Sequence, residues 1–506
     1  MSSSAPTTSD RAGQATTLER RWLSAAVWPA AVWLGAALYA LLLAAESIAD
    51  HNGFRTGFDT AIYDQLLWLL AHGEEPFSTV VSRPMLADHF QPGLVLLTPL
   101  YWLGLDVPGI LALQSIGLAL TAPGLFALAR AYGATAALAS IPAFLWLLCP
   151  WVASVNLFEF RPTTFAPALL VVSVLAAHQR RDFLLVASTV VALSLKEDVS
   201  LTYVVLGLLV AYQGRRRAGL ILAGASAAYF VIASWAITSQ AGSYDAFGQR
   251  YAGERGESVG EALVWALTHP LATLSDVASQ SLLPLALIFL ATAGLPLLAP
   301  LWMLLAAPTV AYNALSAYSP QHDLDNHYHL FTVTGLFVAA AIGVVRLPSL
   351  GRNGRLAAAG GLTLALGVAL VGGIEVHQRP GGGVELDRAA AERALARIPP
   401  DAPVAAVLPM LPHLSQRAEV YTLPEPFVSL DWGSSLSAAE LAERAERIQY
   451  VAYIEGEQAR TFYTGELGRR RAVPDARGFL RRAGFVVIAR AGPLEILERR
   501  RARARD

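Results

Sequence analysis

The chain of 506 residues is 54% hydrophobic and only 15% charged, and its mean hydropathy is +0.44. Soluble domains carry about 25% charged residues, so this composition excludes a soluble enzyme and indicates a protein that is membrane-embedded for most of its length. Lys and Arg number 38 against 39 Asp and Glu, a formal net charge of −1, so the total charge says nothing about nucleic acid. The partners that we expect do not include nucleic acid. A chain whose single cysteine is Cys149 cannot form an intramolecular disulfide.

Residues 1–21 are polar and predict a disordered cytoplasmic N-terminus. Apolar runs of roughly 17–25 residues mark membrane-spanning helices. The first run is too long for a signal peptide, so we expect it to be retained. Residues 22–376 therefore predict a polytopic transmembrane domain. The expected spans lie near 22–48, 108–130, 134–153, 163–178, 218–239, 278–297, 298–317, 326–345 and 356–375.

Two further segments decide the number and direction of the crossings. Residues 183–213 are long enough for a hairpin of two short crossings, whereas 92–105 are short and we expect them not to span. This arrangement gives about eleven crossings and a cytoplasmic N-terminus, because arginines prefer the cytoplasmic ends of helices. The arginines that it places inside are Arg20, Arg21, Arg130, Arg180, Arg181, Arg215, Arg216, Arg217, Arg346, Arg352 and Arg355.

The same arrangement gathers the polar motifs on the outer face of the membrane. A large first outer loop covers residues 49–91, and seven of the ten histidines fall in outer loops. The cytoplasmic loops hold little besides arginine. We therefore expect the chemistry of this protein on its outer face.

The motif GFDTAIYDQLLW (57–68) opens the first outer loop and carries two acids, Asp59 and Asp64. If the motif is helical, Asp59 and Tyr63 share one face. Asp59 follows Gly57 near the expected start of this helix, and its carboxylate could cap the helix, as the side chain of Asp commonly does. An acid just after the first crossing is also well placed to act as a base on a lipid-linked substrate, and both interpretations stay open.

The motif MLADHFQPG (85–93) places Asp88 and His89 just before an apolar run. The ordinary interpretation is the start of a helix, with Pro92 in its first turn. In the alternative, the imidazole of His89 contacts a phosphate or a metal.

The motif FEFRP (158–162) carries Glu159 and Arg161 two residues apart. On an extended segment both side chains face the same side, so they can line a substrate site together. The competing interpretation is an interfacial ion pair that ends a helix before Pro162.

The stretch LSLKEDVSLTY (193–203) is the most specific local signal. Lys196 is the only lysine of the chain, and it stands beside Glu197 and Asp198 between apolar flanks. Each charge costs about 3 kcal/mol at the centre of a bilayer, so charges at membrane depth are usually functional. A compact ammonium suits a phosphate oxygen, and the two acids can orient Lys196, hold a divalent ion or bind a sugar. The alternative is a solvated hairpin tip.

The motif HDLDNHYH (322–329) has Asp323 and His327, and likewise Asp325 and His329, at i,i+4 spacing. On a helix such a pair can hold a divalent metal through oxygen and nitrogen ligands. No tight zinc signature such as H-E-x-x-H is present, and the alternative is a solvated, His-rich loop.

The character of the sequence changes near residue 377. The interval 437–447 predicts a helix, and the last two β-like runs predict a hairpin closed at Ala491–Gly492. We expect residues 377–506 to form an extracytoplasmic α/β domain. The β-like runs are 402–410, 418–423, 426–432, 448–456 and 484–497.

Five motifs in order resemble a family of bacterial multi-pass membrane proteins, domain-of-unknown-function family 2079. They are FDTAIYDQLLW, DHFQPGLVLLTPLYWL, LFEFRPTTFAPALL, LKEDVSLTYVVLGLLV and NHYHLFTVTGLF, and they cover roughly residues 50–345. That family usually has Asp-Phe-His-Pro where this chain has Glu159-Phe160-Arg161-Pro162, so a role that needs an imidazole there is in doubt.

That family is itself similar to the GT-C glycosyltransferase superfamily. Members of the superfamily have many membrane helices, an acid near the start of a large first outer loop and often a soluble outer domain. They take sugars from polyprenyl-phosphate carriers. The resemblance therefore implies an α-helical polytopic membrane glycosyltransferase of the bacterial cytoplasmic membrane. It would move a sugar from a polyprenyl-phosphate-linked donor to a cell-envelope glycan or protein on the outer face.

In this hypothesis Asp59, or as second choice Asp64, is the general base of a single displacement at the anomeric carbon. Lys196, assisted by Arg161 and His89, stabilises the leaving phosphate. The other residues expected to contact the lipid phosphate or the sugar are Glu159, Glu197, Asp198 and Tyr328, and a divalent metal is expected, if anywhere, at Asp323 and His327.

The alternative is a lipid or solute transporter, whose broken helices and buried charges give a similar pattern. Transporters often contain internal repeats, and the sequence shows none. A non-catalytic scaffold would leave the Lys196–Asp198 cluster without a function.

Overall fold

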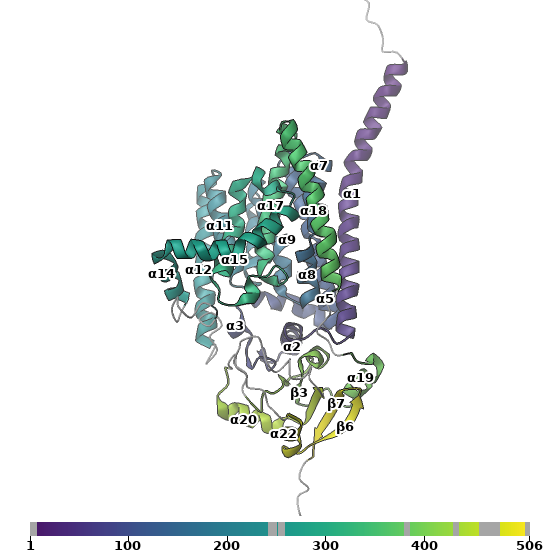
Figure 1. Ribbon diagram of the computed structural model, residues 1–506, viewed down its shortest axis with the longest axis vertical. Coiled ribbons are helices and arrows are strands. Elements are labelled where there is room, and N and C mark those ends of the chain that lie inside the picture. Colours follow the sequence, from purple (N-terminus) through teal and green to yellow (C-terminus); the bar gives the residue numbers. More distant parts are fainter. Residues whose placement is uncertain are drawn as a thin grey trace, which may run out of the picture.

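The computed structural model describes residues 8–240, 250, 259–378, 385–428, 435–454 and 476–500. Apolar helices form a bundle, and a small sheet lies at one end of that bundle (Figure 1). The first helix, α1 (Thr8–Asn52), runs along the bundle and extends past the end that is remote from the sheet.

Six helices in the described part of the chain are long and apolar enough to cross a membrane. The pair α7 and α8, which bends by 43°, makes a seventh if it is counted as one span. The other four expected spans coincide with shorter or broken helices, namely α9 (Ala166–His178), α10 (Asp182–Leu193), α11 (Val199–Tyr212) and the segment of η4 (Pro300–Ala306) and α16 (Ala307–Leu315). The six long apolar helices named first are Ala26–Asn52 of α1, Val107–Ala131 (α5, Val107–Ala119, and α6, Thr121–Ala131), α12 (Arg216–Gln240), α15 (Pro270–Ala291), His327–Ser349 (including α17, Leu330–Gly343) and α18 (Arg352–Gln378).

The other helices of the bundle and its loops are shorter. Residues 92–105 contain only η1 and α4, which are too short to span, as expected. The bounds are α3 (Met85–Asp88), η1 (Pro92–Leu97), α4 (Thr98–Trp102), α7 (Ala136–Leu147), α8 (Pro150–Phe158), η2 (Pro162–Phe165), α9 (Ala166–His178), α10 (Asp182–Leu193), α11 (Val199–Tyr212), α14 (Val259–Thr268), η3 (Leu295–Leu298), η4 (Pro300–Ala306), α16 (Ala307–Leu315), η5 (Ser319–Gln321), η6 (His327–His329) and η7 (Val344–Ser349).

Helices α10 and α11 form the hairpin expected over residues 183–213. Arg215, just after α11, donates hydrogen bonds to Asp182 at the start of α10 and to the carbonyl oxygen of Ala177. The two open ends of the hairpin therefore lie together, and residues 194–198 form its tip at the other end.

Helix α11 packs closely on α12 because glycines meet at the contact. A Cβ on either Gly207 or Gly219 would overlap the backbone of the opposite helix. Small residues allow such an approach between membrane helices, and this contact fixes the position of the hairpin and of its tip.

The C-terminal region contains a five-stranded mixed sheet in the order β4-β3-β5-β7-β6. Strand β3 is parallel to β4 and β5, while β7 is antiparallel to β5 and β6, which confirms the predicted final hairpin. The expected helix over 437–447 is α20, which begins with a capping box between Ser437 and Glu440. The bounds are β3 (Val404–Ala406), β4 (Val420–Thr422), β5 (Tyr450–Ile454), β6 (Phe485–Ala491), β7 (Leu494–Arg499), α19 (Arg388–Leu395), η8 (Leu408–His413), α20 (Ala438–Arg447) and α22 (Ala476–Arg482).

One expected β-run, 426–432, is not a strand where it is described, because Phe427 and Val428 lie in a turn. Residues 429–434 lie outside the described residues. The fold class is nevertheless the one that composition and patterning predict: an α-helical polytopic membrane protein with a small α/β region at its C-terminus.

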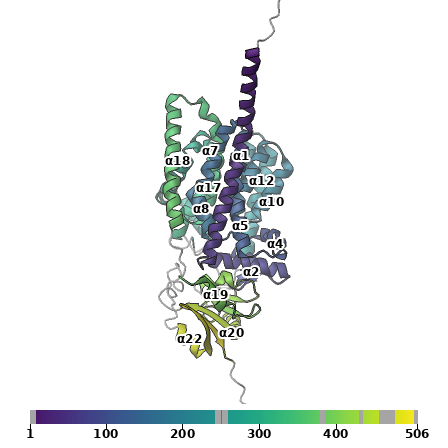
Figure 2. The same ribbon diagram turned by 90° about the vertical axis from the view of Figure 1, so that its right-hand side faces the viewer.

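Helix α2 (Phe58–His72) lies across the end of the bundle, between the other helices and the sheet (Figure 2). The short hairpin of β1 (Phe77–Ser78) and β2 (Arg83–Pro84) follows it. Apolar side chains of the loop 49–91, which is the expected first outer loop, share one core with the sheet, for example Leu67 and Val80 with Val404. The loop and the C-terminal region therefore support each other.

Gln65, fully buried on α2, ties these elements together. Its amide oxygen accepts a hydrogen bond from the backbone N–H of Thr79 (2.9 Å), and its amide nitrogen donates to the hydroxyl of Thr79 (2.7 Å) and to the carbonyl oxygen of Arg417 (3.3 Å). The Thr79 hydroxyl in turn donates to the carbonyl oxygen of Val420 on the edge strand β4 (2.7 Å). This network holds the chain that leads to Arg83 and His89 in one conformation.

Candidate active site

A cavity of about 480 Å³ lies between the helical bundle and the first outer loop. Its walls come from the start of α2, the loop around β2, the end of α8, the tip of the α10–α11 hairpin and the segment 318–328. Seven residues that the sequence singles out line this one cavity: Asp59, His89, Arg161, Lys196, Asp323, His327 and Tyr328.

The start of α2 faces the segment that follows α8. Arg161 forms an ion pair with Asp59, and the carboxylate of Glu159 accepts a hydrogen bond from the backbone N–H of Thr60 (2.8 Å). Both Glu159 and Arg161 are extended, so both side chains reach the same helix end, as the spacing predicts. The capping interpretation of Asp59 is wrong, because Gly57 is the N-cap and no side chain caps α2.

Glu159 lies behind the Asp59–Arg161 pair and outside the cavity wall. Burial raises the pKa of its carboxyl group, and the neighbouring carboxylate of Asp59 raises it further. Glu159 therefore supports the backbone of α2 at Thr60 and has no described contact with the cavity.

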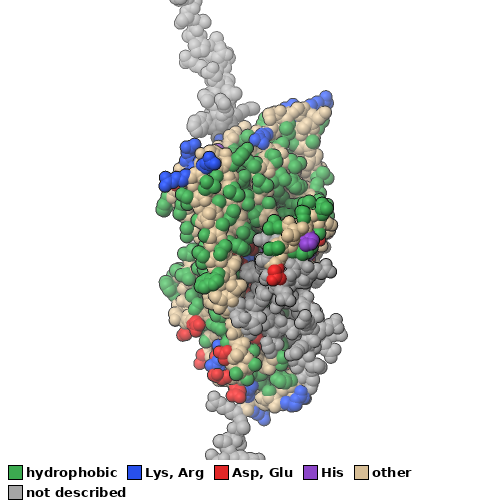
Figure 3. Space-filling model, turned by 90° about the vertical axis from the view of Figure 1, so that its left-hand side faces the viewer, with side chains coloured by type: hydrophobic (Ala, Val, Ile, Leu, Met, Phe, Trp, Pro, Cys, Tyr) green, Lys and Arg blue, Asp and Glu red, His purple; other side chains and the backbone are tan. Residues whose placement is uncertain are grey.

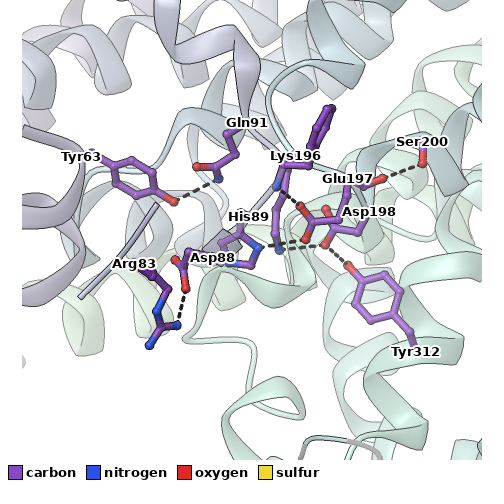
Figure 4. A network of polar contacts seen from close by, with 11 residues as sticks. Tyr63, Arg83, Asp88, His89, Gln91, Lys196, Glu197, Asp198, Ser200 and Tyr312 are labelled. Atoms are coloured by element: carbon purple, nitrogen blue, oxygen red, sulfur yellow. Dashed lines mark hydrogen bonds and ion pairs between the residues drawn. The ribbon is translucent and has the colours of Figure 1, made fainter. Parts of the chain in front are cut away.

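Lys196 reaches the cavity from the hairpin tip. Its ammonium donates to the carboxylate of Asp198 (2.9 Å), which also accepts a hydrogen bond from the hydroxyl of Tyr312 (3.3 Å) (Figure 4). Burial disfavours the charge, but the carboxylates of Asp198 and Glu197 outweigh burial and raise the pKa of Lys196. The lysine is thus a fixed cation, and Asp198 holds its position.

Glu197 is directed to a different partner. One carboxylate oxygen lies 2.9 Å from Nδ1 of His89, and the other accepts the backbone N–H of Phe90 (3.0 Å) (Figure 4). Burial would raise the pKa of Glu197, but the neighbouring His89 and Lys196 outweigh it and hold the pKa well below its usual range. The buried carboxylate therefore connects the hairpin tip to the first outer loop.

Three further charged side chains line the cavity: Arg83, Asp88 and Arg250. Arg83, only 2% exposed, donates to the carboxylate of Asp88 (2.9 Å). Arg250 lies over the rings of Tyr318 and Tyr328, 5.2 and 5.7 Å from their centroids. Neither arginine is among the residues that the motifs single out. The available signal was that both fall in loops expected on the outer side, against the preference of arginine for cytoplasmic loops.

Asp64 lies away from the cavity and contacts the C-terminal region. Its carboxylate accepts hydrogen bonds from Tyr101 (2.7 Å), Ser415 (2.5 Å) and Gln416 (3.1 Å). Burial raises the pKa of Asp64 to about 6, although these three donors lower it. Its geometry supports a role in holding the C-terminal region against α2.

Residues 322–329 do not form the helix on which the metal interpretation depends. Only the short helices η5 and η6 flank a turn there, so the i,i+4 geometry of Asp323 with His327 does not form. The described residues contain no group of three or more His, Cys, Asp or Glu side chains placed to hold a metal ion. Asp323 and His327 alone do not provide a sufficient ligand set.

A family model described as "Predicted membrane protein (DUF2079)" matches residues 51–458, which is most of the chain. The chain belongs to the DUF2079 family of predicted membrane proteins. The resemblance drawn from the five motifs is thereby confirmed, and every residue that lines the cavity falls within the matched range.

No curated protein matches this DUF2079 chain. The solved structures that are similar to it include two of ArnT from Cupriavidus metallidurans. The form bound to undecaprenyl phosphate is 14% identical, with a TM-score of 0.49 over 90% of this chain and 97% of that chain. The apo form is 12% identical, with a TM-score of 0.48 over the same shares.

In this DUF2079 chain the cavity offers more positive than negative side chains. The described wall contains the cations Arg83, Arg161, Lys196 and Arg250 and the carboxylates Asp59, Asp88 and Asp323. Aromatic rings, among them Phe58, Phe158, Tyr318 and Tyr328, complete it. Fixed cations beside aromatic rings suit an anionic group attached to a sugar.

Proposed function

We propose that this protein is a membrane glycosyltransferase that takes a sugar from a polyprenyl-phosphate carrier. The observation that carries the proposal is a cavity lined by four cations and three carboxylates at the end of an apolar helical bundle. A lipid phosphate has an anionic group for such a cavity and a long apolar chain for the surrounding membrane. Arg161, Lys196 and Arg250 are the side chains that we assign to the phosphate.

We place this cavity on the outer side of the bacterial cytoplasmic membrane. On the face drawn in Figure 3, Lys and Arg side chains gather at the end of the apolar band remote from the C-terminal region, while the end near that region carries both acidic and basic side chains. Because positive residues prefer the cytoplasmic side, the N-terminus is assigned to the cytoplasm and residues 377–506 to the outside.

The reaction is a single displacement. A hydroxyl oxygen of the acceptor attacks the anomeric carbon, the bond from that carbon to the phosphate oxygen breaks, and the phosphate oxygen keeps the electron pair. Fixed cations at the leaving phosphate stabilise the developing charge without the reorganisation that water would need. The aromatic rings hold the sugar by stacking.

The acceptor hydroxyl must lose its proton during this step. We assign this proton to Asp59 or His89, two of the titratable groups on the cavity wall, since Asp64 is directed to Ser415 and Gln416. The C-terminal region borders the first outer loop that forms one cavity wall. We assign it to the binding of the acceptor, a cell-envelope glycan or protein.

Turnover of a donor tests this function. The purified protein in lipid nanodiscs is given a panel of polyprenyl-phosphate-linked hexoses and pentoses with a bacterial envelope extract as acceptor. Release of polyprenyl monophosphate is then measured. We expect wild type to consume at least one donor, the Lys196→Ala variant to consume none and Arg352→Ala to match wild type.

The control Arg352→Ala removes one positive charge at the end of α18 that is remote from the cavity. A wild-type protein that consumes no donor from the panel contradicts the proposal. So does a Lys196→Ala variant with wild-type turnover.

A further inference from the structure

The buried carboxylate of Glu197 fixes the position of His89. Glu197 is only 1% exposed, whereas His89 is 19% exposed and lines the cavity. Both oxygens of Glu197 are engaged with the same short segment, one with Nδ1 of His89 and one with the N–H of Phe90. The imidazole therefore cannot rotate without breaking a buried contact.

This contact decides which ring nitrogen carries hydrogen. An ionised carboxylate only accepts hydrogen bonds, so Nδ1 of His89 must donate to Glu197. Nε2 is then the nitrogen that meets a substrate, and in the neutral ring it is a proton acceptor. A buried carboxylate behind an imidazole also stabilises the imidazolium that forms when Nε2 takes a proton.

Asp59, the other side chain considered for the proton, is already engaged. Its carboxylate forms an ion pair with Arg161 on the same cavity wall. Asp59 is thus suited to hold Arg161 in position, while the pair of His89 and Glu197 is suited to receive a proton.

We propose that His89 is the catalytic base of the transfer and that Glu197 is its positioning residue. The proposal rests on the proposed function. Nε2 of His89 takes the proton of the acceptor hydroxyl as its oxygen bonds to the anomeric carbon, and polyprenyl phosphate leaves with the electron pair of the broken bond. The imidazolium is held by Glu197 and then returns its proton to water.

The surroundings of His89 include groups of both signs. Glu197 faces it from the hairpin tip and Asp88 precedes it in the loop, while Lys196, Arg250 and His327 lie along the same cavity. A general base must be unprotonated to accept the proton, so loss of the base removes a limb of the pH–rate profile. That limb is the readout that distinguishes His89 as base from His89 as a structural residue.

The test uses His89→Gln and Glu197→Gln in full-length protein in nanodiscs, with the polyprenyl-phosphate sugar that wild type consumes. His89→Gln keeps a polar side chain but cannot accept the proton, so we expect turnover to fall about 100-fold or more, within the range for loss of general base catalysis. Binding of polyprenyl monophosphate should stay within about threefold of wild type, and the acid limb of the profile should disappear.

Glu197→Gln retains an acceptor for the N–H of Phe90 but removes the negative charge behind the ring. The imidazolium becomes less stable, so the acid limb should move to lower pH and turnover should fall. A variant that merely loosened the loop would lower turnover without moving the limb.

The outcomes separate the two proposals. If wild type neither binds polyprenyl monophosphate nor consumes a donor, the proposed function fails and the role of His89 fails with it. If wild type is active, a His89→Gln variant with an unchanged profile overturns only the role of His89. If His89→Gln loses binding and turnover to the same extent, the role of His89 as base is also overturned, because His89 would then be a phosphate ligand.

Discussion

Asp59 on α2 forms an ion pair with Arg161, which lies 102 residues later in the chain and just after α8. The two members of this pair should have opposite effects on an anionic ligand. Arg161→Gln removes a cation from the cavity, so the affinity for polyprenyl monophosphate should fall about 10- to 100-fold, as for a lost hydrogen bond to a charged group. Binding to the protein in nanodiscs gives the affinity.

Asp59→Asn removes the competing anion and leaves Arg161 available to the ligand. The affinity for polyprenyl monophosphate should therefore equal or exceed that of wild type. Equal losses of affinity in both variants would mean that the pair acts as a structural unit, and that Arg161 does not contact the phosphate.

The loop that carries His89 is pinned to the hairpin tip at Gly93. The N–H of Gly93 donates to the carbonyl oxygen of Ser194 (2.8 Å), and a Cβ at this position would lie 2.5 Å from the Ser194 hydroxyl and 2.8 Å from that carbonyl. Gly93→Ala must displace the loop. Because small displacements of reacting groups are costly, donor turnover should fall about 10- to 100-fold.

Gly224→Ala on α12 is the matched control, since a Cβ there meets nothing within 4 Å. Its turnover should equal that of wild type. Wild-type turnover in Gly93→Ala would show that the contact between the loop and the hairpin tip does not matter for the site.

The buried carboxyl of Asp64 gives a pH-dependent stability. Burial raises its pKa to about 6 from an ordinary 3.8, so the folded protein holds this proton more tightly than the unfolded chain. The protonated carboxyl group of Asp64 therefore stabilises the folded protein at low pH. This contribution to the free energy of unfolding is lost as pH rises from about 4 to about 6. The difference amounts to about 3 kcal/mol.

Thermal unfolding in detergent across this pH range measures the effect. The melting temperature of Asp64→Asn should change less steeply with pH than that of wild type. Asp401→Asn, which replaces an exposed carboxyl of the same C-terminal region, should retain the wild-type slope. An unchanged slope in Asp64→Asn would assign the dependence to other groups.

Much of the site follows from the sequence because the fold class restricts where chemistry can be placed. Polar side chains are costly among membrane helices, so polar motifs at the same ends of successive apolar runs meet in space. Asp59, His89, Arg161 and Lys196 come from four such motifs, and all four line one cavity. The number of clearly spanning helices was less predictable, since α9, α10 and α11 are short.

The partners of these residues could not be predicted from local spacing. Glu197 adjoins Lys196 in sequence, yet it contacts His89, 108 residues away. Asp64 and Asp59 share one helix, and only the packing of the C-terminal region on α2 directs Asp64 to Ser415.

The residues from 322 to 329 show how a local pattern can be overridden. Their spacing fits a helix, but Asp and Asn favour turns. The hydroxyl of Ser154 also binds the carbonyl oxygen of Asp325 (2.7 Å). The segment therefore folds as a turn against α8, and the predicted metal geometry is lost.

The most direct test of the central claim is the binding of polyprenyl monophosphate to wild type, Lys196→Ala and Arg352→Ala in nanodiscs. If the cavity binds a lipid phosphate, wild type and Arg352→Ala will bind it equally. Lys196→Ala will then lose about 10- to 100-fold in affinity, as expected for one charge-assisted contact. Absence of binding by wild type, or equal binding by all three, would contradict the assignment of Lys196 to the phosphate of a polyprenyl-phosphate donor.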